Sequence, residues 1–496
     1  MKISTLRRLL TLAVLGLTTS TLFGQVFQFT TPAGSAGQPG YVDATGAAAR
    51  FNRPTALATD AAGNVYVSEA GNATIRRVTP AGVVTTLVAL PNVVAGLAVD
   101  SAGNVIVADA FGHVIRKVTP AGVVSVIAGS PGISGSADGT PAAARFSSPA
   151  GVTVDTSGNI YVADTGNHTI RKIAVGGAVT TVAGLAGVTG SANGSGAVAR
   201  FYSPEGLVIA PSGNLFVADT GNSAIRRIST SAEVTTFAGT TGYSGFSNGT
   251  GTAARFYFPR GLALDAAGNL YTGDYYYNTV RKITPAAVVT TIGGSPNNSG
   301  SVDGLDGSAR FNYPTGFAVD SAGNLFIADS QNHVLRRGTP IIAVAISSQP
   351  GSVGLVAGQT TTFSVAATGT APITYQWQRR AAETTDFVQL NDGGAYSGAT
   401  TAALTVTGVA ASMHGDQFRC LVDNAAAAPA LSGVATLSIN AAPVITSAAT
   451  ANFYAGLGGN FTVTATGFPA PVFSVTTGAL PTWAAFNPTT GVLTGT

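Results

Sequence analysis

Residues 145–184 read RFSSPAGVTVDTSGNIYVADTGNHTIRKIAVGGAVTTVAG and contain four short runs that are rich in β-branched residues. The runs are GVTVD, NIYVAD, TIRKI and AVTTVAG, and the gaps between them carry the turn signals TSGN, TGNH and VGG. Short runs of this composition, separated by clusters of Gly, Asn and Ser, are typical of consecutive antiparallel strands. The stretch therefore predicts one four-stranded antiparallel sheet.

The same stretch recurs along the chain, and a Gly-Asn turn marks each copy. The turn occurs six times, and the steps between copies are 40, 55, 55, 55 and 55 residues. The six turns are Gly63-Asn64, Gly103-Asn104, Gly158-Asn159, Gly213-Asn214, Gly268-Asn269 and Gly323-Asn324. Four strands in each copy at a fixed period predict the blades of a β-propeller. We therefore expect an all-β chain that begins with a six-bladed β-propeller of four-stranded antiparallel blades.

These copies resemble the NHL repeat, which combines Pro-x-Gly, an Asp before Gly-Asn, a Tyr-Val-Ala-Asp strand and a following Asn-His. The copy at 145–184 carries Pro149, Gly151, Asp155, Gly158, Asn159, Tyr161, Asp164, Asn167, His168 and Ile170 at these positions. The resemblance covers residues 25–340. It implies a β-propeller, but it implies no single chemistry.

The last copy lacks a clear fourth strand after Arg337. Residues 26–31, at the other end of the repeat region, read VFQFTT and are followed by a connector of the kind that follows other fourth strands. We predict that residues 26–31 complete the last blade, which would leave no open sheet edge there. Residues 341–346 are the alternative for the same position.

Five of the six connectors into a first strand carry a longer insert, and the second copy lacks it, which explains the single 40-residue step. Each insert ends in an arginine: Arg50, Arg145, Arg200, Arg255 and Arg310. In a propeller these connectors share one face with the loops between second and third strands, and the Gly-Asn turns lie on the opposite face. We expect the insert arginines to pair with blade carboxylates; a ring that holds an anion at the channel mouth is the alternative.

The first 24 residues have the composition of a bacterial-type secretory signal peptide, with Lys2, Arg7 and Arg8 before an apolar run. Without them, the 25 basic residues fall by three to 22, which equals the 22 acidic residues. A neutral chain without a Lys/Arg-rich block lacks the electrostatic signature of a nucleic-acid binder. We expect a secreted or cell-surface protein without a later membrane helix, and a C-terminal anchor beyond residue 496 stays open.

Residues 341–440 resemble an immunoglobulin-like β-sandwich, in which Trp377 would be the buried tryptophan and Cys420 would hold the second cysteine position. Val365 stands in place of the first cysteine and Phe418 in place of the corner tyrosine, so no disulfide is expected. Cys420, the only cysteine, is then expected to be a buried thiol, and a reactive role is the alternative. Residues 441–496 resemble a truncated second sandwich, of the cadherin-like type found in bacterial surface proteins.

A basic doublet on each third strand repeats with the period. The doublets are Arg76-Arg77, Arg116-Lys117, Arg171-Lys172, Arg226-Arg227, Arg281-Lys282 and Arg336-Arg337. Each is a hairpin away from an acidic residue that ends the second strand: Glu69, Asp109, Asp164, Asp219, Asp274 or Asp329. We expect ion pairs between neighbouring strands or blades, and a patterned anion-binding surface is the alternative.

Other polar residues repeat in the turns and connectors. Asp60, Asp100, Asp155, Asp265 and Asp320 precede the Gly-Asn turns and are expected to cap turn amides. His113, His168 and His333 share one repeat position, which favours loop hydrogen bonds over a shared metal site. The connector pairs that begin at Asp138, Asn193, Asn248 and Asp303 are the candidate calcium ligands, and no other cofactor is expected.

The fifth copy departs from the repeat. Its loop after the second strand reads Tyr275-Tyr276-Tyr277-Asn278, and the preceding connector holds Tyr243 and Phe246 before Arg255. We expect these seven residues to gather on the insert-bearing face, because loop and connector emerge there. Tyrosine combines an apolar ring with a polar tip and suits a glycan or a partner protein. Packing of the insert against the blade is the alternative.

Three hypotheses for function follow. The first is a secreted or cell-surface, non-catalytic binding protein whose partner is a glycan or an extracellular protein. The second is a metal-dependent lyase or lactonase, as certain six-bladed relatives are. The third is a rigid spacer within a larger surface protein. The absence of nucleophile-elbow, zinc-helix and phosphate-loop motifs favours the first.

Overall fold

The computed structural model describes residues 25–424, 426, 428–454 and 456–495. The expected signal peptide, residues 1–24, lies outside the described residues. The chain divides into two compact units, and the boundary between them follows Ile341. The described helices are three-residue 3-10 turns, and none is long enough to cross a membrane.

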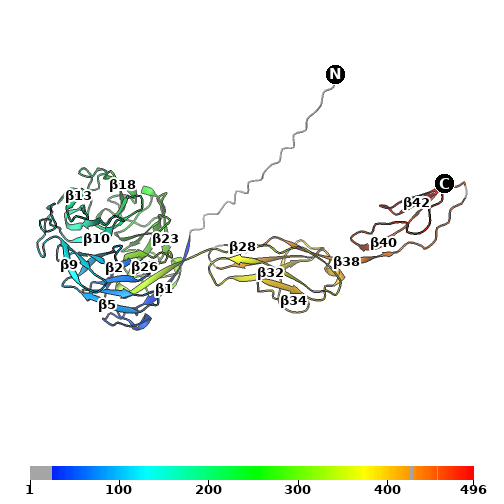
Figure 1. Cartoon of the computed structure of the whole chain (residues 1–496), viewed down its shortest axis with the longest axis horizontal. Helices are drawn as coiled ribbons and strands as arrows, with labels where there is room; N and C mark the ends of the chain where they lie inside the picture. The colour runs from blue at the N-terminus through cyan, green and yellow to red at the C-terminus, as the bar shows by residue number, and fades with distance from the viewer. Residues whose placement is uncertain (1–24, 425, 427, 455, 496) are drawn as a thin grey trace, which may run out of the picture. The chain divides into compact units, whose positions relative to one another are not determined.

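The first unit is built from antiparallel sheets that follow one another along the chain (Figure 1). The described residues from 26 to 341 form six of them, which we number in chain order. Sheet 1 contains β2 (Pro54–Thr59), β3 (Val65–Glu69), β4 (Thr74–Val78) and β5 (Val84–Ala89). Sheet 2 contains β6 (Val94–Val99), β7 (Val105–Asp109), β8 (Val114–Val118) and β9 (Val124–Ala128). Sheet 3 contains β10 (Pro149–Val154), β11 (Ile160–Asp164), β12 (Thr169–Ile173) and β13 (Val179–Ala183).

The remaining three sheets repeat this order and gain a short edge strand from the connector. Sheet 4 contains β15 (Pro204–Ile209), β16 (Leu215–Asp219), β17 (Ala224–Ile228), β18 (Glu233–Ala238) and the edge strand β14 (Gly194–Ser195). Sheet 5 contains β20 (Pro259–Leu264), β21 (Leu270–Asp274), β22 (Thr279–Ile283), β23 (Val288–Gly293) and the edge strand β19 (Gly249–Thr250). Sheet 6 contains β25 (Pro314–Val319), β26 (Leu325–Asp329), β27 (Val334–Ile341), β1 (Val26–Ala33) and the edge strand β24 (Gly304–Leu305).

The first strands of the sheets form a closed circle. Each first strand contacts the first strand of the next sheet, and β25 contacts β2. The glycine of Pro-x-Gly permits this approach: a Cβ on Gly206 would lie 2.2 Å from the carbonyl oxygen of Arg260, and one on Gly316 would lie 2.5 Å from that of Thr55. The sequence motif therefore sets how closely the sheets surround the central axis.

The N-terminal strand β1 is the fourth strand of sheet 6. It pairs with β27 in a register that places Val26 opposite Ile341 and Phe29 opposite Gly338. The rings of Phe27 and Phe29 are fully buried between sheets 5 and 6. Residues 345–348 form β28 (Ala345–Ser348), which belongs to the second unit and pairs with β31 (Ala366–Thr368). Sheet 6 therefore combines strands from both ends of the repeat region.

Each of five sheets contains one fully buried arginine, which is the first residue of that sheet's basic doublet. Arg171 shows the pattern: its Nη1 atom donates to Asp164 Oδ2 at 2.9 Å and to the carbonyl of Arg145, and its Nη2 atom donates to Asp138 Oδ1. The equivalents in sheets 1, 4, 5 and 6 are Arg76, Arg226, Arg281 and Arg336. The predicted ion pairing is confirmed, and each arginine ties two strands to the connector.

Sheet 2 is the exception, because its connector is short. Arg116 pairs with Asp109 at 2.7 Å, and its side chain stays 12% exposed. Asn92 also donates to Asp109. The missing insert therefore removes the second acceptor segment that covers the arginine elsewhere.

The Asp residues before the Gly-Asn turns cap those turns as predicted. Asp155 Oδ1 accepts hydrogen bonds from the backbone N–H groups of Ser157 and Asn159, and its Oδ2 accepts one from the Asn159 side chain. In sheet 4 this position is Ala210, and Ser212 takes over the contact with Asn214. The confirmed role is structural.

In the part of the chain that the structure describes, the five insert arginines form no ion pair with a carboxylate, so that prediction was wrong. Arg145 donates from Nη1 to the backbone carbonyls of Ala142, Ala143 and Ala144. Arg50, Arg200 and Arg310 do the same within their own connectors. These arginines follow carbonyls that end a single turn, and the connector carboxylates Asp43, Asp138 and Asp303 bind the buried arginines instead.

The histidines join neighbouring sheets. His113 and His168 accept hydrogen bonds at Nδ1 from the N–H groups of Ser148 and Ser203, both at the start of the next sheet. His333 accepts from Arg53 at 3.0 Å, which links sheet 6 to sheet 1. The predicted loop hydrogen bonds are confirmed. In sheet 5 the same contact is made by Asn278, which accepts from the N–H group of Tyr313.

The second unit is also all-β. One sheet contains β29 (Val353–Val356), β38 (Ala435–Ile445), β36 (Gln417–Asp423), β32 (Thr374–Arg380) and β33 (Val388–Gln389), with β37 (Ala430–Leu431) beside β36. A facing sheet contains β30 (Thr361–Ser364), β35 (Ala403–Val406) and β34 (Tyr396–Ser397). Both contribute to one core around Trp377 and Phe418. The two layers form a β-sandwich.

Cys420 lies opposite Trp377 in this core and is fully buried. Burial raises the pKa of its thiol to about 11, so the thiol is neutral at physiological pH. β38 continues past residue 440 and pairs there with β40 (Ala465–Phe468). A further sheet contains β39 (Gly459–Thr462), β42 (Val492–Gly495) and β41 (Ala484–Asn487).

The two carboxylate partners of a buried arginine differ in exposure, so their removal is expected to change the free energy of unfolding by different amounts. Replacing Asp164 with Ala leaves the Arg171 charge buried without its buried partner, and we expect a loss of about 3–5 kcal/mol in the free energy of unfolding. Asp138 contacts the same arginine but is 46% exposed, so Asp138→Ala is expected to cost about 1 kcal/mol or less. Urea denaturation of both variants measures the difference; equal losses would contradict this account.

The histidine contacts predict a pH dependence. Burial, together with the charge of Arg53, lowers the pKa of His333 below its usual range, and the neutral ring accepts the Arg53 N–H. A group with a lowered folded-state pKa contributes stability that is present above its unfolded pKa of about 6.5 and is lost as the pH falls.

His333→Asn places at this position the residue that sheet 5 uses. We expect the stability of the natural chain to fall more than that of the variant between pH 7.5 and pH 5.5, as measured by urea denaturation at both pH values. A parallel fall in the two proteins would exclude His333 as a contributor.

Candidate functional site

Six aromatic side chains from sheets 5 and 6 form one connected group, which we call the aromatic cluster. Its members are Tyr257, Phe258, Tyr275, Tyr276, Tyr277 and Tyr313. Neighbouring ring centroids lie between 4.6 Å (Tyr275 to Tyr313) and 6.0 Å (Tyr276 to Tyr313). Distances in this range are those that aromatic pairs prefer. The cluster combines the loop between β21 and β22 with the residues that precede β20 and β25.

The cluster leaves one central ring accessible. Tyr276 contacts Tyr257, Phe258, Tyr275 and Tyr313, yet it is 43% exposed. Phe258 and Tyr313 have φ values of 56° and 55°, in the left-handed region. That conformation costs a non-glycine residue about 1 kcal/mol. Arg53, Ser148 and Ser203 have the same left-handed conformation in their copies, so this backbone geometry belongs to the repeat, and the aromatic side chains are what distinguish these two positions.

The sequence-predicted residues divide into two sets. Tyr275, Tyr276 and Tyr277 join the cluster, and buried Asn278 fixes its edge through the contact with Tyr313. Phe246 lies beside the cluster, 5.5 Å from the Tyr277 ring and 4.8 Å from the Arg281 guanidinium. Tyr243 is 66% exposed, and the Arg255 guanidinium lies 5.7 Å from its ring.

Sequence reasoning missed half of the cluster. Tyr257, Phe258 and Tyr313 lie in the two positions before the proline that starts a first strand. Alignment of the copies at that proline gives Asn52-Arg53, Ser147-Ser148, Tyr202-Ser203, Tyr257-Phe258 and Asn312-Tyr313. The aromatic excess in the fifth and sixth copies was therefore visible, but only with every position of the repeat compared.

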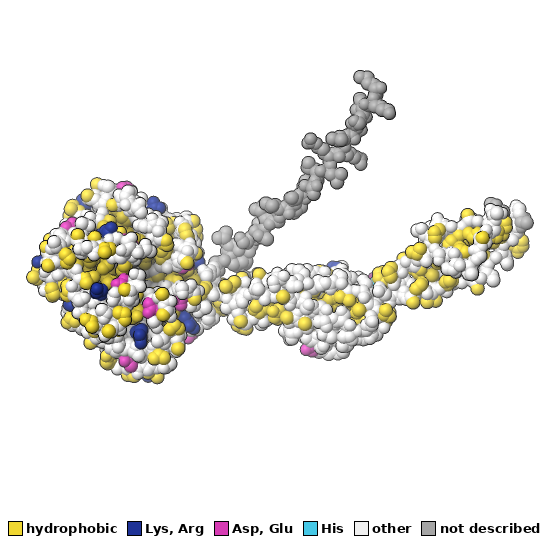
Figure 2. All heavy atoms as spheres, viewed as in Figure 1, with side chains coloured by type: hydrophobic (Ala, Val, Ile, Leu, Met, Phe, Trp, Pro, Cys, Tyr) yellow, Lys and Arg dark blue, Asp and Glu magenta, His cyan; other side chains and the backbone are white. Residues whose placement is uncertain are grey.

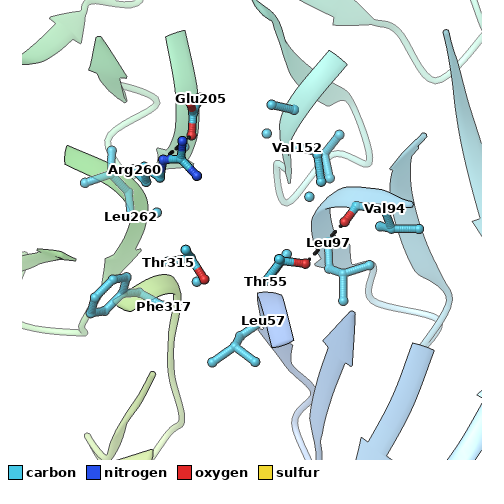
Figure 3. A pocket seen from close by; sticks show the side chains of 18 of the residues that line it. Thr55, Leu57, Val94, Leu97, Val152, Glu205, Arg260, Leu262, Thr315 and Phe317 are labelled. Carbon is cyan, nitrogen blue, oxygen red and sulfur yellow. Dashed lines mark hydrogen bonds and ion pairs between the residues drawn. The ribbon is translucent and has the colours of Figure 1, made fainter. Parts of the chain in front are cut away.

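A cavity lies inside the circle of first strands, beside the aromatic cluster. Its volume is about 220 Å³. Most of its lining is apolar and includes Leu57, Leu97, Val152, Leu262 and Phe317 (Figure 3). The second residue of each first strand also lines it: Thr55, Ala95, Ala150, Glu205, Arg260 and Thr315.

Glu205 and Arg260 are the charged pair of this cavity, and they lie side by side on one wall (Figure 3). Glu205 Oε2 is 3.4 Å from Arg260 Nε. Desolvation raises the pKa of Glu205, and the Arg260 charge opposes the rise. The Arg260 guanidinium also lies 4.1 Å from the centroid of the Tyr275 ring, which joins the cavity to the aromatic cluster. No other copy has a charge at this position, and that departure was the overlooked signal.

The polar residues considered as metal ligands have other partners. The histidines accept backbone hydrogen bonds, and Asp138 and Asp303 bind Arg171 and Arg336. Asn193 and Asn248 accept hydrogen bonds from Arg226 and Arg281. Within the part of the chain that the structure describes, no three His, Cys, Asp or Glu side chains converge as a metal site would require.

On the face of the first unit that Figure 2 shows, charged side chains do not concentrate in one patch. Figure 2 shows Lys, Arg, Asp and Glu scattered singly over the face in view. This distribution agrees with the equal numbers of acidic and basic residues after residue 24.

Three segments match the family model of the NHL repeat: residues 146–173, 201–228 and 311–336. The chain contains NHL repeats. Human NHL repeat-containing protein 2 is 32% identical over 236 residues, which cover 41% of this chain and 32% of the human protein. Protein SUPPRESSOR OF QUENCHING 1, chloroplastic, of Arabidopsis thaliana is 28% identical over 188 residues, which cover 36% of this chain and 18% of that protein. The chain therefore spans about a third or less of the length of these relatives.

Solved structures share the fold of the NHL-repeat unit. A protein of unknown function from Bacteroides thetaiotaomicron superposes with a TM-score of 0.53 at 21% identity, covering 64% of this chain and 76% of that one. An auxiliary nutrient binding protein from Bacteroides ovatus gives a TM-score of 0.52 at 20% identity, covering 64% and 77%. The chain is all-β, and its repeats adopt a β-propeller fold.

The contact of Phe246 with Tyr277 predicts an energetic coupling. Three other copies have Ser at the first position (Ser136, Ser191, Ser301) and Asn at the second (Asn167, Asn222, Asn332), and the first copy has Tyr41 and Asn72. Aromatic pairs of this kind contribute about 0.5–1.5 kcal/mol beyond their burial. We expect Phe246→Ser and Tyr277→Asn together to cost less than the sum of their single effects by about that amount, as a double-mutant cycle in urea measures. Additive losses would exclude the coupling.

Proposed function

We propose that this chain is a secreted or cell-surface binding protein without catalytic activity, and that its aromatic cluster binds a glycan. In this proposal the six sheets are the blades of a six-bladed propeller, residues 341–440 are an immunoglobulin-like module and residues 441–496 are part of a second sandwich. Secretion would depend on residues 1–24.

The observation that carries the proposal is the exposed Tyr276 ring within the cluster. A ring that is 43% exposed offers an apolar face, while its neighbours hold it in place. Tyrosine hydroxyls around such a face can exchange hydrogen bonds with sugar hydroxyls. The residues that make this surface are absent from the equivalent positions of most copies, so the fold does not require them.

A glycan fits this surface better than a protein partner does. The accessible aromatic area is centred on one tyrosine, with Tyr243 as the other largely exposed aromatic residue of the sheet 5 connector. Stable protein interfaces bury about 800 Å² on each partner, which is far more than one or two rings supply. The name of the Bacteroides ovatus protein, an auxiliary nutrient binding protein, is compatible with a binding role for this fold. An extracellular protein partner is an outcome that the test distinguishes.

Tyr276→Ala tests the proposal, and Phe111→Ala is the matched control. Phe111 occupies the same repeat position in sheet 2 and is 69% exposed, but it lies outside the cluster. On a glycan array, we expect the natural chain and Phe111→Ala to bind the same glycan, and Tyr276→Ala to bind it at least tenfold more weakly, which is about 1.4 kcal/mol.

Thermal denaturation of the three proteins checks that the fold is retained. Equal glycan binding by Tyr276→Ala and the natural chain would refute the proposed role of the cluster. Binding of extracellular proteins but of no glycan would assign the surface to a protein partner instead.

A further inference from the structure

Arg260 differs from the buried arginines of the first unit in how its donors are used. Arg171 donates to two carboxylates and to two backbone carbonyls. Arg260, in contrast, makes a 3.4 Å ion-pair contact with Glu205 and donates no hydrogen bond to any residue between 25 and 495 that the structure describes. Its Nε atom is buried without an acceptor, as in Arg226, Arg281 and Arg336, but the Nη atoms of those three arginines donate to carboxylates, whereas those of Arg260 donate to no described residue. A guanidinium with this many unused donors is suited to an incoming acceptor.

The surroundings of Arg260 restrict the shape of that acceptor. One face of the guanidinium is covered by the Tyr275 ring at 4.1 Å. The edge of the group therefore remains for a ligand, and the side chain is 35% exposed. A guanidinium edge offers two parallel N–H donors, which match the two oxygens of a carboxylate.

Glu205 adds a second requirement. Its carboxylate is 26% exposed and accepts no hydrogen bond from the described protein groups. An anion that approaches Arg260 meets this carboxylate as well, so a suitable ligand carries hydrogen-bond donors beside its own acid group. Hydroxyl groups next to a carboxylate meet this requirement, and burial, which removes water from the Glu205 carboxyl group, raises its pKa.

The size of the cavity and the adjoining aromatic residues complete the description. A volume of about 220 Å³ lies below the range of about 300–1,000 Å³ that drug-sized ligands occupy, so it suits a single sugar ring. Leu262 and Phe317 in the lining offer apolar side chains to such a ring, and the Tyr275 ring lies against the Arg260 guanidinium.

We propose that the cavity beside the aromatic cluster binds a hexuronate, an acidic sugar, with its carboxylate on the Arg260 guanidinium and its hydroxyl groups on Glu205. This inference rests on the proposed function and adds the class of glycan. The hexuronate is either a free sugar or the terminal residue of an oligosaccharide, because both present the same carboxylate and hydroxyl groups.

Calorimetric titration of the full chain with sodium glucuronate, glucose and a trisaccharide that ends in glucuronate tests the inference. We expect glucuronate to bind at least tenfold more tightly than glucose, because glucose lacks the carboxylate. Binding of both acidic probes indicates a site open to free sugars, and binding of the trisaccharide alone indicates recognition of a chain end. Sodium sulfate is the fourth probe, and we expect it to compete poorly.

Arg260→Met retains the length of the side chain and removes its charge. We expect this variant to lose the preference for glucuronate over glucose, and Arg260→Lys to retain only part of it. Arg77→Met is the control, because Arg77 is an exposed arginine of sheet 1 outside the cavity. Thermal denaturation of each variant checks the fold.

Three results would overturn the inference: equal binding of glucuronate and glucose, an unchanged preference in Arg260→Met, or displacement of glucuronate by equimolar sulfate. The first of these, together with neutral-glycan binding that depends on Tyr276, would leave the proposed function intact. No binding of any glycan, acidic or neutral, would refute both.

Discussion

A buried arginine must keep its charge and still find acceptors, and the first unit is arranged around that requirement. Removal of an unpaired charge from water costs several kcal/mol, so the side chain is tolerated only with close partners. In sheet 3, Arg171 obtains them from the end of β11 and from the connector that precedes β10. The connector therefore has to fold back over its own sheet. Sheet 2 has no insert, and there Arg116 remains partly exposed.

The parts of the structure that follow from a repeated local pattern could be predicted from the sequence. The strand runs, the capped Gly-Asn turns and the pairing of Arg171 with Asp164 all depend on residues within one hairpin of each other. The partner of Arg145 was predicted wrongly, because the charge of an arginine does not show whether it donates to a carboxylate or to backbone carbonyls. Local spacing also could not show that β38 continues past residue 440.

The candidate site depends on contacts between copies, which explains why only part of it was predicted. Tyr275 and Tyr276 stood out because they are consecutive. Glu205 and Arg260 are 55 residues apart and meet only because neighbouring first strands lie side by side in one register. Comparison of every repeat position would have identified both residues as departures, but not their contact. Glu205, Arg260 and Tyr275, which all depart from the repeat, thus come into contact across neighbouring sheets.

The pairing of β1 with β27 has a mechanical consequence. A tensile force applied to the chain at Ile342 enters the first unit along β27, which is hydrogen-bonded to β1 on one edge and to β26 on the other. Force along the strand loads both rows of hydrogen bonds in shear, so many bonds must break together before the strand slides. If the second unit transmits pulling force, for example when a ligand is held under flow, the repeat unit receives that force through one of its most firmly held strands.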